Sequence, residues 1–497
     1  MFRFREFTPP STLLLICIAF AIAALYLYGS SAVGVLGPDE PRYSAIGHAM
    51  LQRHDFVTPV LWGSPWFEKP PLLYWMTAAG AAWGLSPEAA GRIPVALMSL
   101  CFLLSMFWFL RAEFGLLAAA CSTCMLATAA GWLAYSGLCL TDIPLAVSFG
   151  VAVFLSLPLL RPHPDERASA WRFAGIGICL GLGALAKGLV PFALALPFFW
   201  FLRAYRRQFV WAIGACLLVA LPWYLLVYAR NGWPFIDELF IRHHFERLYS
   251  DALQHGQPPY YYVPVLLAGT FPWTALLLLL IPFRSRGGLA AFDRRERFLL
   301  VLVAFGFVFF SCSYNKLPGY LLPLLPPLFA LLGSRLAQRG TVPLDRRWLL
   351  ACALPIALIP LVAELLPPSL IAGRFVMPPL FLRTGTPFLV YALVPLVALF
   401  FRHRTWIAPA LLASAILGGF LIKMTAYPVL DGFVSARRVW YTVQSQAPRL
   451  CDAGTRRDWI YGLSFYRGSF IGYCQEKPGV LAIRSHEHSL PQFGPLH

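Results

Sequence analysis

The sequence predicts a mainly α-helical, polytopic membrane protein with a small α/β unit at its C-terminal end. Of its 497 residues, 59% are hydrophobic and only 13% are charged, whereas soluble domains carry about 25% charged residues. Long unbroken apolar runs account for this composition, and such runs form transmembrane helices. A large soluble helical domain would need many more polar helix faces.

Thirteen apolar segments are the expected transmembrane helices. The first follows a short basic N-terminus, and we expect an uncleaved anchor here rather than a signal peptide, because a dozen apolar segments follow. The expected spans are 13–28, 93–110, 116–135, 143–160, 173–186, 189–202, 210–228, 262–281, 298–312, 321–332, 348–366, 387–401 and 406–426.

The basic residues indicate the side on which each connection lies. The formal net charge is +17, but the arginines are spread over alternate hydrophilic breaks, which is the positive-inside pattern of a membrane protein. We therefore expect a lipid bilayer around the chain and no nucleic-acid partner. With a cytoplasmic N-terminus, residues 29–92 and 427–497 both lie on the opposite face.

The segment 71–84 of the first loop is apolar but too short to span, and both it and the segment 41–52 are expected as interfacial helices. The tail 427–497 is polar and is expected to form a small α/β domain with strands near 459–462 and 469–473. It contains Cys451 and Cys474, whereas the other cysteines lie mostly in apolar runs. Because the topology places the tail in an oxidising compartment, we expect a disulfide between these two. Two unrelated thiols are the alternative.

Three acidic residues precede prolines on this face. Asp39, Glu68 and Asp142 each stand two residues before a Pro. Since Pro favours the first helical turn and Asp favours the N-cap, the pattern predicts three helix N-termini. A plain helix cap explains each acid equally well when it is taken singly. Together, ionisable groups at a membrane face indicate a functional site.

Basic and aromatic residues accompany these acids. Arg42, Lys69 and Lys187 lie nearby, and cations at helix N-termini favour an anionic ligand such as phosphate. Lys316 and Tyr320 open the tenth expected span and could reach the same phosphate. They are equally explained by a snorkelling lysine and an interfacial aromatic belt.

The loop after the seventh expected span contains the pair His243-His244. A histidine pair beside acids could bind a divalent metal, although a solvated loop histidine is the commoner arrangement. The sequence has no P-loop, no Gly-rich dinucleotide fingerprint and no serine elbow on a suitable element. We therefore expect no nucleotide cofactor, and an activated lipid as the source of energy.

At these residues the chain resembles the GT-C superfamily of polyprenyl-phosphate-dependent glycosyltransferases. It is most similar to the bacterial aminoarabinose transferases of lipid A, which are related to protein O-mannosyltransferases. The resemblance covers about residues 13–330 and its motifs are specific only when taken together. They are Asp39-Glu40-Pro41-Arg42-Tyr43, Phe67-Glu68-Lys69-Pro70-Pro71-Leu72-Leu73-Tyr74-Trp75, Leu140-Thr141-Asp142-Ile143-Pro144, Ala186-Lys187-Gly188, His244 with Arg247, and Lys316-Leu317-Pro318-Gly319-Tyr320.

The resemblance implies roles for these residues. Asp39 would lie at the reacting centre, and Asp142 would support it. Glu68 and His244 would be ligands of a divalent metal such as zinc. The residues expected to bind the donor phosphate or the substrate are Arg42, Tyr43, Lys69, Lys187, Arg247, Lys316 and Tyr320.

The resemblance also implies a reaction and a location. The transmembrane domain 1–426 would transfer a sugar, such as 4-amino-4-deoxy-L-arabinose, with inversion from a polyprenyl-phosphate donor. The acceptor would be lipid A or a related envelope glycan at the periplasmic face of the bacterial inner membrane. Protein O-mannosylation and lipid or solute transport are the alternatives. Transporters commonly show internal repeats and charges at mid-membrane, whereas these charges gather on one face.

Overall fold

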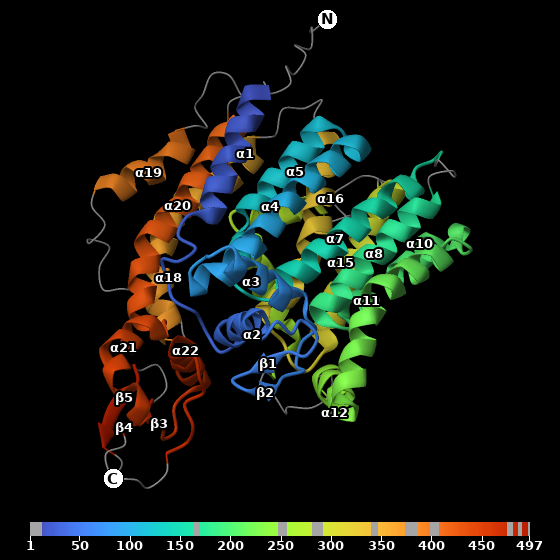
Figure 1. Cartoon of the computed structure of the whole chain (residues 1–497). Helices are drawn as coiled ribbons and strands as arrows, with labels where there is room; N and C mark the ends of the chain where they lie inside the picture. The colour runs from blue at the N-terminus through green and yellow to red at the C-terminus, as the bar shows by residue number, and fades with distance from the viewer. Residues whose placement is uncertain are drawn as a thin grey trace, which may run out of the picture.

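The structure is a computed structural model and shows a helical bundle with a small mixed unit at one end (Figure 1). The described residues are 12–163, 169–246, 256–280, 292–338, 346–372, 386–397, 407–474, 481–485 and 490–495. The C-terminal unit and helix α2 (Asp39–Arg53) lie at the same end of the bundle (Figure 1). The predicted class, a mainly helical membrane fold, is confirmed.

Within the described ranges, six helices are long and apolar enough to cross a membrane, or up to eight if two bent pairs each form one span. The six are α4 (Pro87–Phe114), α7 with η1 (Asp142–Ser156, Leu157–Leu160), α8 (Ser169–Lys187), α11 (Phe209–Asn231), η9 with α16 (Pro318–Leu324, Leu325–Gln338) and α20 (Ile407–Phe433). The bent pairs are η5 and α14 with η6 (Pro259–Tyr261, Tyr262–Gly269, Thr274–Leu280) and α17 with α18 (Arg346–Ala357, Ile359–Ala372). The expected count of thirteen spans is not confirmed.

One cause of the difference is a break in the helix inside an apolar run. Residues 116–135 were expected as one span, but Ala129 is extended and divides it. The N–H of Ala130 donates to the carbonyl of Phe271 (2.8 Å), so another segment satisfies the freed backbone group. The bundle's other elements are α1 (Thr12–Leu27), α5 (Leu116–Thr128), α6 (Ala130–Tyr135), α9 (Val190–Leu194), α10 (Leu196–Phe201), η3 (Arg203–Tyr205), α12 (Trp233–Ile236), the π-helical η4 (Asp237–Glu246), α15 (Arg294–Cys312) and α19 (Thr386–Val397).

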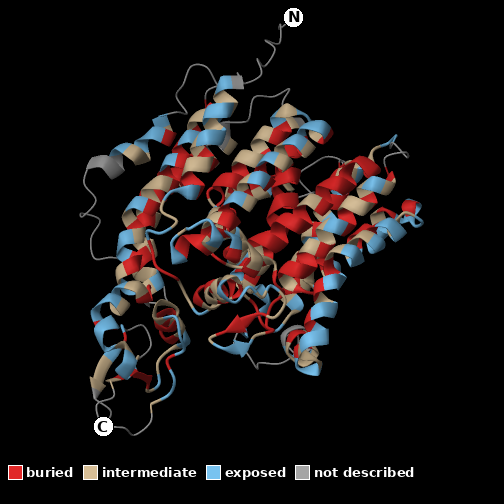
Figure 2. Ribbon diagram, viewed as in Figure 1, coloured by how far each residue is buried: buried red, intermediate tan, exposed pale blue. Residues whose placement is uncertain are grey.

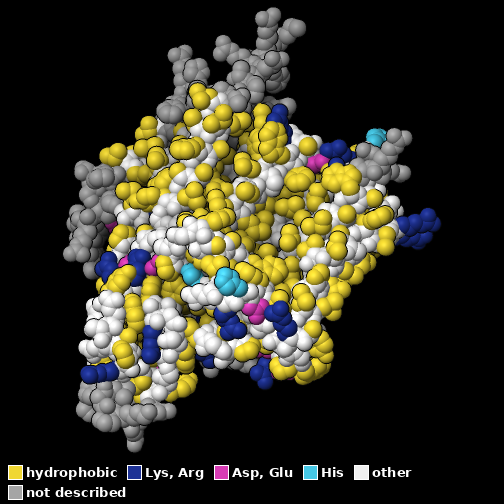
Figure 3. Space-filling model, viewed as in Figure 1, with side chains coloured by type: hydrophobic (Ala, Val, Ile, Leu, Met, Phe, Trp, Pro, Cys, Tyr) yellow, Lys and Arg dark blue, Asp and Glu magenta, His cyan; other side chains and the backbone are white. Residues whose placement is uncertain are grey.

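Helix α7 lies in the core of the bundle, where buried residues concentrate (Figure 2). Its membrane-length window is 94% buried, whereas that of α11 is 22% buried. The outer helices present apolar side chains such as Leu218, and hydrophobic side chains cover much of the visible bundle surface (Figure 3). An apolar exterior of this size fits contact with lipid. The first residue of the central helix is Asp142, which the packing of α7 therefore holds in a fixed position.

The first loop folds against the end of the bundle. Its two expected interfacial helices are present as α2 and α3 (Leu72–Ala82), which pack on each other and on α4. Between them, β1 (Val60–Leu61) and β2 (Ser64–Pro65) form an antiparallel hairpin. Gly80 permits the close contact of α3 with α4, because an added Cβ would lie 2.1 Å from the carbonyl of Ala90.

The C-terminal unit consists of α21 (Ala436–Val443), η12 (Gln444–Arg449), α22 (Arg457–Arg467) and a sheet of order β3–β4–β5 (Leu450–Asp452, Leu481–Arg484, Gln492–Pro495). The strand expected at 459–462 is wrong, because this segment belongs to α22. Trp459, Ile460 and Leu463 are buried at helical spacing. Residues 469–473 contribute only an isolated bridge from Tyr473 to Asp452.

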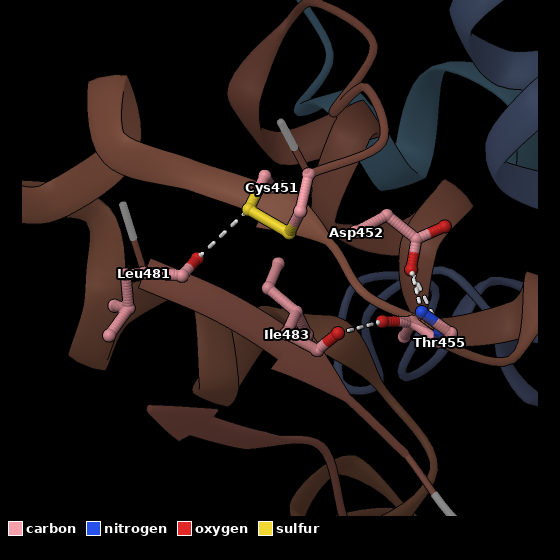
Figure 4. Close-up of a disulfide and its surroundings, with 7 residues drawn as sticks. Cys451, Asp452, Thr455, Leu481 and Ile483 are labelled. Carbon is pink, nitrogen blue, oxygen red and sulfur yellow. Dashed lines mark hydrogen bonds between the residues drawn. A yellow bond between two sulfur atoms is a disulfide. The ribbon is translucent and has the colours of Figure 1, made fainter. Parts of the chain in front are cut away.

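A disulfide joins Cys451 of β3 to Cys474, which is the pair that the sequence analysis expects (Figure 4). The backbone N–H of Cys474 also donates to the carbonyl of Asp452 (2.9 Å). The Asp452 side chain accepts from the N–H groups of Gly454 (3.1 Å) and Thr455 (2.7 Å). The covalent bond therefore closes a loop that contains the whole of α22.

The C-terminal unit is anchored to the first loop by charged groups. Arg437 pairs with Asp431 at the end of α20 (2.9 Å). Tyr466 donates to Glu88 (3.0 Å), and Asp431 accepts from the N–H of Gly34 (2.8 Å). An added Cβ at Gly34 would lie 2.1 Å from Ser435 Oγ. Three segments distant in sequence therefore meet without space for a larger side chain.

A buried lysine joins helices α1 and α20. Lys423 of α20 donates to the carbonyls of Leu25 (2.6 Å) and Tyr28 (2.9 Å) at the C-terminal end of α1. The last carbonyls of a helix have no intrahelical partner, and a cation there is favourable. Lys423 thus satisfies the end of α1 from the opposite end of the chain.

Candidate active site

Most of the predicted site residues form two clusters at the end of the bundle that also bears the C-terminal unit (Figure 1). The first contains Asp39 and Arg42 from the first turns of α2, together with Glu68 and Lys69 from the loop before α3. The second is built by Asp142 at the start of α7 and by residues of α8 and η9.

Arg42 is the centre of the first cluster. Its guanidinium contacts the carboxylate of Asp39 and donates to Glu68 Oε2 (2.8 Å). Lys69 Nζ lies 3.1 Å from the other oxygen of Glu68. The Asp39 side chain is 37% exposed, whereas those of Glu68, Lys69 and Arg42 are 10–12% exposed. Asp39 is thus the carboxylate of this cluster that solvent or a ligand reaches most easily.

Aromatic rings surround the same guanidinium. The Arg42 Cζ atom lies 5.2 Å from the Trp66 ring, 5.3 Å from the Tyr461 ring and 5.9 Å from the Tyr43 ring. Burial alone would lower the pKa of Arg42, but the carboxylates of Glu68 and Asp39 outweigh burial and hold the pKa above its ordinary value. Arg42 is therefore a permanent cation in a partly desolvated site, where it can attract an anionic group strongly.

The second cluster pairs Asp142 with Lys187. Their side chains are 12–13% exposed, and Lys187 Nζ lies 2.6 Å from Asp142 Oδ1. The ammonium also lies 4.7 Å from the centre of the Tyr320 ring. The start of the central helix, the end of α8 and the turn η9 therefore meet at one ion pair.

Gly319 leaves room for this pair. A Cβ at position 319 would lie 2.6 Å from Asp142 Oδ1 and 2.8 Å from the Tyr135 ring. We expect Gly319→Ala to displace the Asp142 carboxylate. The rate of the expected sugar transfer should fall about 10²-fold at normal protein abundance.

The measurement is the initial rate with purified protein. The matched control is Gly137→Ala, since the nearest atom to its added Cβ is 3.7 Å away. A wild-type rate for Gly319→Ala would mean that the position of Asp142 does not matter for the reaction.

The acids do not act as helix caps. Helices begin at Asp39 and Asp142, as expected, but α3 begins at Leu72, four residues after Glu68, so the expected N-terminus at Glu68 is wrong. The residues before α2, α3 and α7 make no side-chain capping hydrogen bond. The three carboxylates instead pair with cations from other parts of the chain or from the next turn.

Lys316 lies in neither cluster. Its ammonium donates to the carbonyls of Gln257 (2.8 Å) and Ser313, and only 4% of the residue is exposed. It borders an open, largely apolar cavity of about 620 Å³ that is also lined by Phe307 and Tyr314. In this structure Lys316 fixes the loop between α15 and η9.

The expected metal ligands do not assemble into a metal site within the described residues. The side chain of His244 and the whole of Arg247 lie outside them. Glu68 directs one oxygen toward Arg42 and the other toward Lys69, and the described part of the chain contains no group of three or more His, Cys, Asp or Glu suited to a metal. A cation at Glu68 would have to compete with two protein cations, so we derive no step through a metal.

The sequence analysis missed Arg92, which forms a buried ion pair with Glu40. Arg92 Nε and Nη2 donate to the two carboxylate oxygens (2.7 and 2.6 Å). Glu40 also accepts from the backbone N–H groups of Leu36 (2.7 Å) and Cys139 (3.0 Å). The sequence does contain a signal for this pair. Arg92 stands at the start of an apolar run, where a charged side chain is costly in free energy unless it is paired.

The chain is similar to known glycosyltransferases in sequence. A family model described as dolichyl-phosphate-mannose-protein mannosyltransferase matches residues 11–233. The undecaprenyl phosphate-alpha-4-amino-4-deoxy-L-arabinose arabinosyl transferase of Pseudomonas aeruginosa is 33% identical over 356 residues, covering 65% of this chain and 59% of that protein. The protein of the same name from Pectobacterium atrosepticum is 33% identical over 353 residues, covering 67% of this chain and 60% of that protein. The matched region thus spans about three fifths of these relatives.

Two solved structures share the fold. ArnT from Cupriavidus metallidurans, bound to undecaprenyl phosphate, superposes with a TM-score of 0.74 at 22% identity, covering 94% of this chain and 87% of ArnT. The archaeal oligosaccharyltransferase AglB from Archaeoglobus fulgidus superposes with a TM-score of 0.51 at 12% identity, covering 93% of this chain and 64% of AglB. The chain therefore has the fold of ArnT, and its resemblance in sequence to the aminoarabinose transferases is confirmed.

Proposed function

We propose that this protein is a membrane glycosyltransferase that uses a polyprenyl-phosphate sugar donor. The observation that carries the proposal is the cluster of Arg42, Lys69, Glu68 and Asp39, which combines buried cations with one accessible carboxylate. The names of the sequence relatives and the undecaprenyl phosphate bound to ArnT support it. We propose 4-amino-4-deoxy-L-arabinose as the sugar and lipid A or a related envelope molecule as the acceptor.

In the proposed reaction, an acceptor oxygen attacks the anomeric carbon of the sugar. The bond from that carbon to the phosphate oxygen breaks, its electron pair leaves on the polyprenyl phosphate, and the configuration inverts. Negative charge therefore grows on the leaving phosphate, where Arg42 and Lys69 can stabilise it. Lys187, which pairs with Asp142, and Tyr320, whose ring lies beside the Lys187 ammonium, are proposed to contact the same donor.

The task of Asp39 depends on the acceptor. A phosphate acceptor is already largely ionised near neutral pH, so Asp39 would balance the charge of Arg42 and orient it. A hydroxyl acceptor must lose a proton, and Asp39 would then accept it. A divalent metal bound by Glu68 and His244 stays a prediction, and the proposed reaction takes no step through it.

The direct test is transfer by the purified full-length protein. Lipid A and an undecaprenyl-phosphate-linked aminoarabinose donor are combined with it, and the products are analysed by mass spectrometry. We expect lipid A to gain the mass of one aminoarabinose residue. If the folded protein does not form this product, the proposed substrates are rejected. The match to the mannosyltransferase family model favours protein O-mannosylation as a second candidate function. The same assay tests it with a mannosyl donor and a Ser/Thr peptide acceptor.

Donor binding depends in this proposal on Lys69. Lys69→Ala removes a cation that lies 3.1 Å from Glu68, and we expect the KM for the donor to rise at least about tenfold. Lys69→Arg is expected to restore little, because a planar guanidinium does not fit the place of an ammonium. The control is Arg53→Ala, an exposed cation at the other end of α2. An unchanged donor KM for Lys69→Ala would remove Lys69 from the phosphate site.

We propose that the protein lies in the bacterial inner membrane with its site facing the periplasm. Alternating basic breaks support this orientation, as does the disulfide of the C-terminal unit, since such bonds persist in oxidising compartments. In intact cells, an impermeant maleimide should label a Ser64→Cys variant at the exposed hairpin. An Ala204→Cys variant at the opposite end should react only after permeabilisation. The reverse pattern would invert the proposed topology.

A further inference from the structure

The C-terminal unit reaches the first cluster through one tyrosine. Tyr461 belongs to α22, and the centre of its ring lies 5.3 Å from Arg42 Cζ. Arg42 meanwhile contacts two carboxylates of the first loop. The Tyr461 ring therefore covers a guanidinium whose hydrogen-bonding edge faces Asp39 and Glu68. An aromatic face attracts such a cation and limits its movement.

A tryptophan of the first loop holds Tyr461 in turn. The Trp62 ring lies 5.5 Å from the Tyr461 ring and 5.4 Å from the Phe470 ring, so two residues of the C-terminal unit flank it. Trp62 forms the turn of the β1–β2 hairpin together with Gly63, and both have positive φ angles (48° and 93°). A bulky side chain in this conformation is strained and persists only where surrounding contacts favour it.

The position of α22 is also set from a separate side. Tyr466, on the same helix, donates to Glu88, and Arg437 pairs with Asp431. The segment that carries Phe470 is bounded by the left-handed Gly468 and by the Cys451–Cys474 disulfide. Tyr461 thus projects from a unit that is anchored independently of Arg42, and it can act as a fixed reference for that side chain.

We propose that Tyr461 is a positioning residue that orients Arg42 toward the donor phosphate, and that docking of the C-terminal unit thereby sets donor affinity. This inference rests on the proposed function, because it assigns the phosphate to Arg42. Its consequence is that the C-terminal unit belongs to the donor site rather than serving only as a cover. The hydroxyl of Tyr461 is not required, since the contact uses the face of the ring.

The test compares Tyr461→Phe, which keeps the ring, with Tyr461→Leu, which removes it. For Tyr461→Leu we expect the donor KM to rise about tenfold, the range of a partly desolvated cation–π contact, with the acceptor KM unchanged. Tyr461→Phe should stay within about twofold of wild type. The control Tyr441→Leu removes a 62% exposed ring of the same unit and should behave as wild type.

A second measurement separates this inference from the proposed function and from a folding defect. Binding of undecaprenyl phosphate alone is measured on folded wild-type and variant proteins, with Trp62→Leu as a second way to release Tyr461. We expect both leucine variants to bind more weakly than wild type. Wild-type affinity in the folded variants, or equal losses in Tyr461→Phe and Tyr461→Leu, would overturn the role of the ring. Failure of the wild type itself to bind would instead count against the proposed function.

Discussion

Asp39→Asn is expected to abolish sugar transfer almost completely while leaving the amount of protein in the membrane unchanged. The amide keeps the shape of the side chain but removes the charge of the most accessible carboxylate in the Arg42 cluster. Among the described residues, Arg42 would then keep Glu68 as its carboxylate partner, and its guanidinium would turn toward it. Loss of either a proton acceptor or a charge partner at the reacting centre should lower the rate on the order of 10³-fold.

The measurement is product formation per membrane-inserted protein, followed by mass spectrometry. Asp55→Asn is the matched control, because Asp55 also pairs with an arginine, Arg230 (2.9 Å), in an ion pair that is partly exposed. Such pairs contribute about 1 kcal/mol or less. Unchanged transfer by Asp39→Asn would reduce Asp39 to the first residue of a helix.

Arg92→Leu is expected to prevent the protein from accumulating in a folded form. The substitution leaves the Glu40 carboxylate, of which 2% is exposed, without its cation. It also removes the donors to the carbonyls of Val33 (2.5 Å) and Gly34 (2.9 Å). Breaking a buried pair from one side costs about 3–5 kcal/mol, which is a large part of the stability of a typical protein.

The measurement is the yield of monodisperse protein in detergent and its thermal unfolding temperature. Arg111→Leu, at the exposed end of the same helix α4, should leave both unchanged. The double variant Glu40→Leu/Arg92→Leu should recover only part of the lost stability, because the backbone groups that hydrogen-bond to Glu40 and Arg92 lose these partners. A normal unfolding temperature for Arg92→Leu would show that the ion pair is dispensable.

The sequence predicted what depends on local pattern. Helix α3 follows from a short apolar stretch between Pro71 and Gly84, and α2 begins at Asp39, two residues before Pro41. Asp39 and Glu40 are adjacent yet differ in role, because successive helical residues point about 100° apart. Asp39 therefore faces the cluster, while Glu40 turns into the core toward Arg92.

What the sequence could not predict depends on contacts between distant segments. Nothing near Tyr461 indicates that it lies over Arg42. The buried spacing of Trp459, Ile460 and Leu463 fits a helix, but aromatic and β-branched content favoured a strand. The segment 116–135 forms two helices instead of one, because the N–H of Ala130 donates to the carbonyl of Phe271, far along the chain.

The link from Lys423 to the end of α1 has a consequence for biogenesis. A ribosome delivers α1 to the membrane before α20. Until then the terminal carbonyls of Leu25 and Tyr28 lack the ammonium that later binds them. A chain interrupted before residue 407 therefore lacks this contact, and α1 and α20 are joined only after α20 has been inserted.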